Sequence, residues 1–367
     1  MHSSDQAALV KHFALVAGWI ILLYALLILV SRLLVPPFHG EVIDTSRAWE
    51  TPYSTSQKLV YYGRDALVGP RDRVIIIGAS NTQLGISARL AGEVLPEHAV
   101  HNLSVVSANV TVMRQLADIA IERIGSDDVA DDIFVLGVWY GSFVSDAYRW
   151  NATEGEKPVT LLDEEAMRFG FTSRLDNGDY FDRVPDEYLG AAQLFAYPLI
   201  ALDRMMRVAT GTRTFPDEAY MNSVELTDEM KEGNIEIRKQ EMGGLPLDPM
   251  QFKKLDMLIR LLNALDAKVI VVNLPIPEWH KAVSPYHAGY VEQITERMSH
   301  HEHRPGFTYV DISDLDDDAW FYDDAHLRPS HRSKWIERLA PALTAAANGD
   351  GASVSEFERK TDVTTVQ

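Results

Sequence analysis

An uninterrupted apolar segment near the N-terminus constrains this chain more than any other feature. Every residue from Phe13 to Val30 is uncharged, and Pro36 and Pro37 follow shortly afterwards. At about 1.5 Å per residue, a helix over this segment spans roughly 27–35 Å, which matches the hydrocarbon core of a bilayer. The two prolines would end such a helix. The segment therefore predicts a transmembrane anchor over residues 13–35.

A cleaved signal peptide is the alternative interpretation of this segment. Its apolar region would be shorter, about 7–15 residues, and would end in small residues at a cleavage site. Here the apolar region is longer and ends in bulky Leu, Ile and Val, which favours an uncleaved anchor. The short N-terminus predicts that residues 1–12 are cytoplasmic. The main domain would then lie outside the cytoplasmic (inner) membrane, in the periplasm of a cell that has one.

The composition of the 367-residue chain excludes several classes of protein. Its 34 basic and 53 acidic side chains give a formal charge of −19. This balance argues against nucleic acid as a partner, because phosphate binding needs clustered Lys and Arg. The absence of Cys excludes disulfide scaffolds, thiolate metal sites and Cys nucleophiles. The run 300–303 (HHEH) is more typical of a solvated loop than of a metal site, so we expect no cofactor and no metal.

From residue 71 onward, short apolar runs alternate with helical patterns. Runs bounded by turn residues are typical of buried parallel strands, and this alternation predicts a doubly wound sheet. We therefore expect a flavodoxin-like three-layer α/β/α fold with about five parallel strands. The predicted strands are 74–78, 100–103, 133–138, 268–273 and 307–311, and the predicted helices are 81–94, 110–124, 250–266, 286–299 and 330–347.

The rest of the chain divides around this α/β domain, which we place at 71–348. Residues 36–70 are rich in Pro, Gly, Ser and Thr and predict a stalk and lead-in. A long insertion follows the third strand, over about 140–248, and would form a lid or a docking surface. Its helical segment 189–208 could instead pack on the sheet, and the charges within it argue against a second membrane span. Residues 349–367 predict a mobile tail.

A serine follows the first predicted strand, in the run Gly78-Ala79-Ser80-Asn81. Gly78 permits a tight turn there. Ser80 would lie at the carboxyl end of a strand and at a helix N-terminus, where free N–H groups stabilise developing negative charge. The alternative is that Ser80 only caps the helix.

An Asp-x-x-His turn precedes the last predicted helix, with Asp323 and His326 three residues apart. Such a turn can place the carboxylate against one imidazole nitrogen while the other nitrogen faces a nucleophile. Asp324 is an alternative orienting residue, and a solvated acidic loop is the alternative to a site. Together with the serine, the turn supplies the residue types of a nucleophile, a base and an orienting carboxylate.

Within the alternation of strands and helices, the Gly78–Asn81 motif and the Asp323–His326 motif resemble those of the SGNH (GDSL-like) hydrolase superfamily. The resemblance covers about residues 71–140 and 265–345. It implies that Ser80 is the nucleophile and that Asp323 and His326 complete a triad. Family members usually have Gly-Asp-Ser where this chain has Gly-Ala-Ser.

The donors of the oxyanion hole depart from the family pattern. The second family block usually supplies a Gly N–H, and the resemblance places Ser104 there. The third block usually supplies an Asn side chain, but this chain has Trp139 and Tyr140. Loss of one such donor costs on the order of 10²–10³ in rate. Asn81 is a further candidate at the site, and the aromatic pair could line a sugar-stacking surface or pack behind the strand.

The aromatic pair and the single N-terminal anchor are similar to an anchored branch of the superfamily. That branch includes the teichoic-acid D-alanylation and alginate-type O-acetylation proteins, which work beside a membrane-bound O-acyltransferase. The resemblance implies an extracytoplasmic serine acyltransferase or esterase. It would act on the acyl groups of a cell-envelope or secreted polysaccharide, and acetyl is the expected acyl group. The acyl donor and the polysaccharide would be its substrates.

Two other functions compete with this one. A non-catalytic partner on the same fold could scaffold a polysaccharide-modifying membrane complex through the insertion. A phosphate or nucleotide site at the Gly78–Ser80 turn is disfavoured, because the P-loop Lys and the Rossmann glycine spacing are absent.

Overall fold

A five-stranded parallel sheet forms the centre of the molecule. The computed structural model describes residues 3–69, 72–153, 158–168, 186–212 and 217–349. The strand order is β2-β1-β3-β4-β5, and every pairing is parallel. All five predicted strands are confirmed: β1 (Arg73–Gly78), β2 (Ala99–Asn102), β3 (Ile133–Val138), β4 (Lys268–Asn273) and β5 (Phe307–Asp311).

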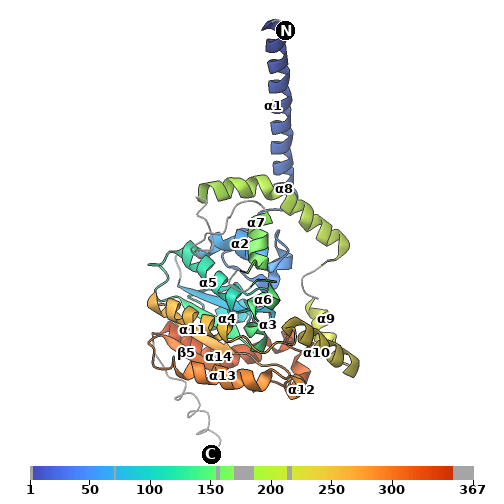
Figure 1. Ribbon diagram of the computed structural model, residues 1–367. Helices are drawn as coiled ribbons and strands as arrows, with labels where there is room; N and C mark the ends of the chain where they lie inside the picture. The colour runs from blue at the N-terminus through green and yellow to red at the C-terminus, as the bar shows by residue number, and fades with distance from the viewer. Residues whose placement is uncertain (1–2, 70–71, 154–157, 169–185, 213–216, 350–367) are drawn as a thin grey trace, which may run out of the picture.

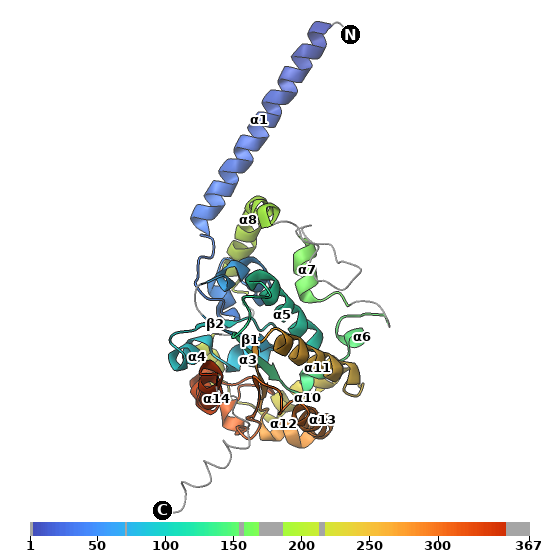
Figure 2. The same cartoon turned by 90° about the vertical axis from the view of Figure 1, so that its left-hand side faces the viewer.

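Helices cover both sides of this sheet, which is why the central strands are continuous apolar runs. On one side, α5 (Val110–Ile124) packs against α11 (Pro249–Ala264). On the other side, α4 (Ala88–Val94) packs against α14 (Arg332–Ala347), and Figure 2 shows the two pairs on opposite sides of the sheet. A further helix, α13 (His287–Ser299), precedes β5.

The helix predicted over 81–94 is two helices. The first, α3 (Ser80–Gly85), ends before Ile86, whose backbone is extended. The Ser87 side chain then accepts a hydrogen bond from the Leu90 N–H and caps α4. The apolar periodicity continues across this break, so the pattern alone predicted one helix. The serine at the break is a good N-cap, and it starts a second helix in a new direction.

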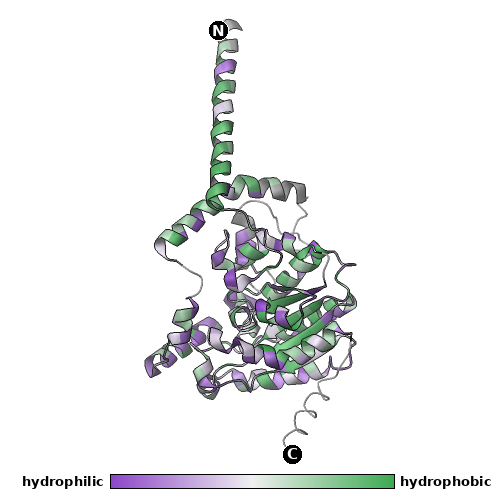
Figure 3. Ribbon diagram, turned by 180° about the vertical axis from the view of Figure 1, so that it is seen from behind, coloured by the Kyte–Doolittle hydropathy of each residue, from purple (hydrophilic) through white to green (hydrophobic). Residues whose placement is uncertain are grey.

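The N-terminal helix stands away from the rest of the molecule. Helix α1 (Ser3–Leu34) projects as a single rod (Figure 1), and its colouring is hydrophobic over most of its length (Figure 3). Within it, residues Ala8–Leu34 are long and apolar enough to cross a membrane, and nearly all of their side chains are exposed. No other helix in the described ranges has this character.

Residues 36–69, where the sequence predicted a stalk and lead-in, contain short helices that pack on the core. They contain η1 (Thr45–Glu50), α2 (Ser56–Gly63) and η2 (Arg64–Leu67). Ile43, Leu59 and Leu67 are fully buried in the main core. The Ile43 N–H donates to His101 Nδ1 at 3.2 Å, which ties this segment to the edge strand β2. Helices this short give too little periodicity to be recognised in the sequence.

The segment between β3 and α11 is almost entirely helical where it is described. Helix α8 crosses the lower end of α1, while α9 and α10 lie beside the body (Figure 1). The predicted tail beyond Gly349 lies outside the described residues. The elements of the insertion are η3 (Tyr140–Phe143), α6 (Asp146–Arg149), α7 (Leu161–Arg168), α8 (Asp186–Thr210), α9 (Glu218–Ser223) and α10 (Asp228–Met242).

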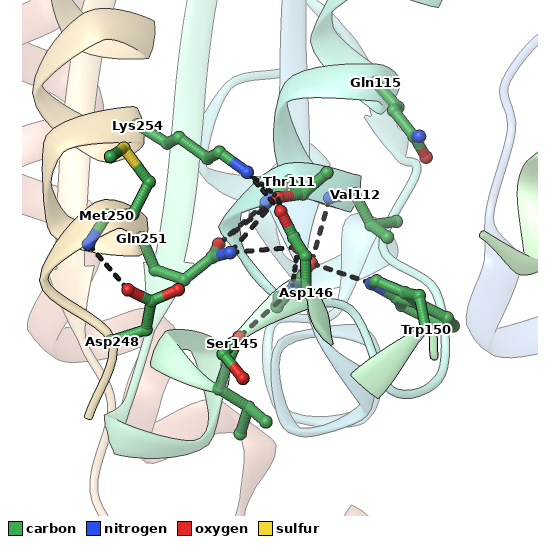
Figure 4. Close-up of polar contacts among 12 residues, drawn as sticks. Thr111, Val112, Gln115, Ser145, Asp146, Trp150, Asp248, Met250, Gln251 and Lys254 are labelled. Carbon is green, nitrogen blue, oxygen red and sulfur yellow. Dashed lines mark hydrogen bonds and ion pairs between the residues drawn. The ribbon is translucent and has the colours of Figure 1, made fainter. Parts of the chain in front are cut away.

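A polar cluster fastens the start of the insertion to the helices on one side of the sheet (Figure 4). Asp146 accepts hydrogen bonds from Thr111 Oγ1 at 2.7 Å and from Gln251 Nε2 at 2.9 Å, and it pairs with Lys254. Asn109 Nδ2 donates to the same carboxylate at 2.8 Å. These partners belong to the start of α5 and to α11, so the chain leaves β3 in a fixed direction.

Candidate active site

The structure brings the three predicted catalytic residues together at the carboxyl end of the sheet. Ser80 is the second residue after β1, and Asp323 and His326 lie in the connection between β5 and α14. His326 Nε2 is 2.8 Å from Ser80 Oγ, although the two residues are 246 positions apart. His326 Nδ1 is 2.7 Å from Asp323 Oδ2. Both distances are those of hydrogen bonds, and the order is nucleophile, base and orienting carboxylate.

Two glycines allow α3 to begin this close to the sheet. A Cβ at Gly78 would lie 2.0 Å from Thr82 Oγ1, and one at Gly137 would lie 2.4 Å from the same atom. Thr82 Oγ1 also donates to the Gly137 carbonyl oxygen at 3.2 Å. Gly78 is thus needed for the close approach of α3, and not for a left-handed turn. This approach sets the position of Ser80, at the first residue of the helix.

The loop around Asp323 holds the carboxylate in one orientation. Asp323 Oδ1 accepts the backbone N–H groups of Ala325 at 2.9 Å and His326 at 2.8 Å. Burial by itself would raise the pKa of Asp323, but its electrostatic interaction with His326 and its hydrogen bonds lower the pKa below the ordinary value. Asp323 is therefore ionised at neutral pH and accepts the His326 Nδ1–H. The other ring nitrogen, Nε2, faces the Ser80 hydroxyl and can accept its proton.

An aromatic ring supports the imidazole of His326 from one face. The ring of Tyr322 stacks on it with centroids 5.6 Å apart and an interplanar angle of 16°. The Tyr322 N–H donates to the His326 carbonyl oxygen at 3.1 Å, which closes the loop on itself. Stacking on the face and a carboxylate at the edge together fix the orientation of the ring, as a preorganised base requires.

The candidate donors to an oxyanion differ in whether they already donate a hydrogen bond within the protein. The Ser80 N–H has no backbone acceptor in the described part of the chain. The Ser104 N–H donates to Asn102 Oδ1 at 3.0 Å, so its predicted role requires that bond to break. Asn81 is fully buried, and its Oδ1 accepts the Thr82 N–H at 2.9 Å. Its Nδ2 has no partner among the described residues, and it is a donor on the residue next to the nucleophile.

The aromatic pair after β3 is packed inside the molecule. Trp139 is 5% exposed and Tyr140 is 1% exposed, with ring centroids 4.7 Å apart. This burial supports the packed pair over the sugar-stacking surface. The two side chains are instead connected to the loop that carries the triad.

A buried histidine makes one of these connections. Burial lowers the pKa of His280, in α12 (Glu278–Val283), so its ring is neutral. His280 Nδ1 lies 2.6 Å from the Asp324 carbonyl oxygen, which can only accept, so Nδ1 carries the proton. Nε2 therefore accepts the Tyr140 hydroxyl at 2.7 Å. The chain of hydrogen bonds joins the end of β3 to the triad loop.

An arginine of the insertion makes the other connection. Arg238 in α10 donates two hydrogen bonds to the buried carboxylate of Asp324, from Nε to Oδ2 at 2.5 Å and from Nη2 to Oδ1 at 3.2 Å. Its guanidinium carbon lies 5.1 Å from the centre of the Trp139 ring. Burial disfavours the charge on Arg238, but Asp324 raises its pKa above the ordinary value. Asp324 is thus engaged by Arg238, and Asp323 orients His326.

Sequence reasoning missed Arg238 and His280. They lie 86 and 44 positions from Asp324, and neither stands in a motif. The one sequence signal for them was Asp324, a second carboxylate next to Asp323. If this loop is buried, the charge of Asp324 needs a buried cation as a partner.

The histidines of the run 300–303 do not form a metal site in the described residues, where no group of three metal-binding side chains is found. His301 instead pairs with Asp256 at 3.0 Å.

No protein-family model matches the chain, and no curated protein matches it significantly. The chemistry of the site is therefore argued from its geometry.

Proposed function

We propose that this chain is a serine acyltransferase or carboxylic-ester hydrolase of the SGNH type, with the flavodoxin-like three-layer arrangement of that superfamily. One observation carries the proposal: the hydrogen-bonded series from Ser80 Oγ through His326 to Asp323. It lies at the carboxyl ends of parallel strands, where open α/β sheets bind their ligands.

The proposed reaction proceeds through an acyl-enzyme. His326 Nε2 takes the Ser80 hydroxyl proton while Ser80 Oγ attacks the acyl carbonyl carbon, and the Ser80 N–H donates to the oxyanion. The tetrahedral intermediate then expels its alcohol, which receives the proton from His326. A sugar hydroxyl or water next attacks the acyl-enzyme and loses its proton to His326. The second tetrahedral intermediate then expels Ser80 Oγ, which takes that proton back from His326. Transfer and hydrolysis differ only in this second nucleophile.

The proposed substrate is an acylated polysaccharide of the cell envelope or a secreted one, with acetyl as the acyl group. The apolar α1 and the resemblance to the anchored branch support a location on the outer, periplasmic side of the inner membrane. A membrane-bound O-acyltransferase would supply the acyl group. The charge of −19 favours a neutral or amino-bearing glycan over a polyanionic one.

A non-catalytic scaffold on the same fold is the second candidate. The observation that favours it is the engaged Ser104 N–H, together with the absence of Asn after β3. An oxyanion hole with one donor would make the chain slow on ordinary esters.

Covalent labelling of the full chain with a serine-directed fluorophosphonate tests the proposal. We expect labelling of the wild type, none of Ser80→Ala, and wild-type labelling of the matched control Ser330→Ala, which removes an exposed hydroxyl. An unlabelled wild type with an intact fold would support the scaffold, and equal labelling of Ser80→Ala would exclude Ser80. Release of acetate from an acetyl ester, with and without a sugar acceptor, then separates transfer from hydrolysis.

A further inference from the structure

Helix α8 has an apolar face that the described part of the chain leaves uncovered. Phe195, Leu199, Leu202 and Met206 are 59%, 59%, 53% and 57% exposed. Their spacing of four, three and four residues places them on one side of a helix. They form a continuous stripe, which we call the α8 stripe.

The opposite side of α8 is attached to the body of the molecule. Tyr197 and Ala201 are buried there. Lys58 Nζ lies 2.7 Å from Asp203 Oδ2, and the guanidinium of Arg204 lies 4.5 Å from the centre of the Trp49 ring. Both charged residues of this part of α8 therefore face the protein, and the apolar stripe faces away from it.

Helix α8 also packs on α1 at a defined depth. The Tyr24 hydroxyl donates to the Phe195 carbonyl oxygen at 2.6 Å, and the two rings stack with centroids 6.2 Å apart. Tyr24 lies within the uncharged run 13–30, about 9 Å before its end at 1.5 Å per residue. Interfacial helices immerse their apolar faces by about 5–10 Å. Phe195 therefore lies level with the apolar segment of α1, at least as deep as the apolar face of an interfacial helix.

We infer that the α8 stripe lies in the surface of the lipid bilayer that α1 crosses. The stripe is continuous with the lipid-facing surface of α1. Helix α8 contains Pro198 and bends where it passes the base of α1 (Figure 1). Lipid acyl chains and headgroups are the occupant. The contact goes beyond the proposed function and does not depend on Ser80. It gives the domain a second attachment, so that one side of it faces the membrane.

The absence of Cys from the chain permits a direct test with single-cysteine variants. Leu199→Cys and Leu202→Cys in the full chain are labelled with a nitroxide and reconstituted into 3:1 phosphatidylcholine–phosphatidylglycerol nanodiscs. Leu26→Cys in α1 is the lipid reference. Ile237→Cys in α10 is the matched aqueous control, because Ile237 is an equally exposed (52%) apolar residue on a helix. Power saturation measures collisions of each label with oxygen and with a water-soluble nickel complex.

We expect oxygen-to-nickel ratios at Leu199 and Leu202 that are several-fold above the ratio at Ile237 and close to the ratio at Leu26. Water-like ratios at both α8 positions, with a lipid-like ratio at Leu26, would overturn the inference. Low accessibility to both reagents at the α8 positions would also overturn it, because protein would then cover the stripe. A water-like ratio at Leu26 would remove the anchor on which the contact depends. Far-UV circular dichroism of each variant checks the fold.

Discussion

The ionised carboxylate of Asp323 determines which nitrogen of His326 faces Ser80. It is held by two backbone N–H groups, and it accepts the Nδ1 proton. Because Asn can present an N–H₂ group to that nitrogen, the Asp323→Asn substitution would favour the wrong imidazole tautomer.

We expect Asp323→Asn to lower the rate of fluorophosphonate labelling by about 10³–10⁴-fold, since loss of the orienting carboxylate has an effect of this size in serine hydrolases. The fold should be retained. Asp314→Asn, which removes an exposed carboxylate of the preceding loop, is the control and should label at the wild-type rate. Labelling of Asp323→Asn at the wild-type rate would show that the carboxylate is not part of the mechanism.

His101 lies outside the candidate site, and its titration affects the free energy of unfolding. Burial lowers the pKa of His101 to about 4, and its neutral Nδ1 accepts the Ile43 N–H. Between pH 6.5 and 4 the unfolded chain binds a proton that the folded chain does not. The free energy of unfolding therefore decreases as the pH falls through this window. At 1.36 kcal/mol for each pH unit, the loss approaches about 3 kcal/mol.

Urea unfolding of the full chain in detergent at pH 7, 5.5 and 4.5 measures this loss. The His101→Asn variant should be less stable at pH 7 but should lose less stability on acidification, because it has no proton to bind there. Identical pH dependence of the two proteins would contradict the assignment.

At the scale of elements, α10 of the insertion holds the loop that carries the triad. Arg238 is joined to Asp324, the neighbour of Asp323. The insertion is thus a structural part of the candidate site, although its sequence contains no recognisable catalytic motif.

We expect Arg238→Met to slow labelling by about 10–100-fold, because small displacements of a catalytic group have effects of this size. It should also cost about 3–5 kcal/mol of stability, since Asp324 would keep a buried charge without a partner. The double variant Arg238→Met/Asp324→Asn removes that charge. It should regain stability but not the labelling rate. If the rate returned with the stability, Arg238 would have no positioning role.

The sequence predicted most elements of the α/β region and missed those outside it. Strands such as Ile133–Val138 are identified by continuous apolar runs, which depend only on burial of both sides of the sheet. The α2 helix has no comparable pattern, because its core contacts come from distant segments. The break at Ser87 was missed because apolar periodicity does not register a change of helix direction.

At the scale of the whole molecule, an ion pair between distant segments attaches α8 to the body. Lys58 is buried in α2, and its ammonium group pairs with Asp203, which is 145 positions away and about one third exposed. The pair thus joins the early part of the chain to the insertion and fixes the side of α8 that faces outward.

We expect Asp203→Asn to lower the free energy of unfolding by about 2 kcal/mol. This is less than for a fully buried pair, because solvent screens Asp203. The control is Glu93→Gln, which breaks the exposed pair with Arg89 and should change stability by less than about 0.5 kcal/mol. Thermal unfolding of the full chain measures both. Equal effects would show that the α2–α8 pair is no more important than a surface pair.

The sequence by itself determined the apolar N-terminal helix, the parallel sheet, and the catalytic candidates Ser80, Asp323 and His326. These follow from local information: an uninterrupted apolar run, short buried strands, and two motifs at strand ends, which parallel topology brings to one edge of the sheet.

Only the tertiary structure decided the rest. It placed apolar residues of the segment 36–69 in the core and paired the Ser104 N–H with Asn102. It also joined Arg238 and His280 to Asp324 and turned the apolar stripe of α8 away from the protein. The physical reason is the same in each case. These features depend on the packing of side chains far apart in the sequence, and the environment of such a side chain is set by segments whose position no local pattern specifies.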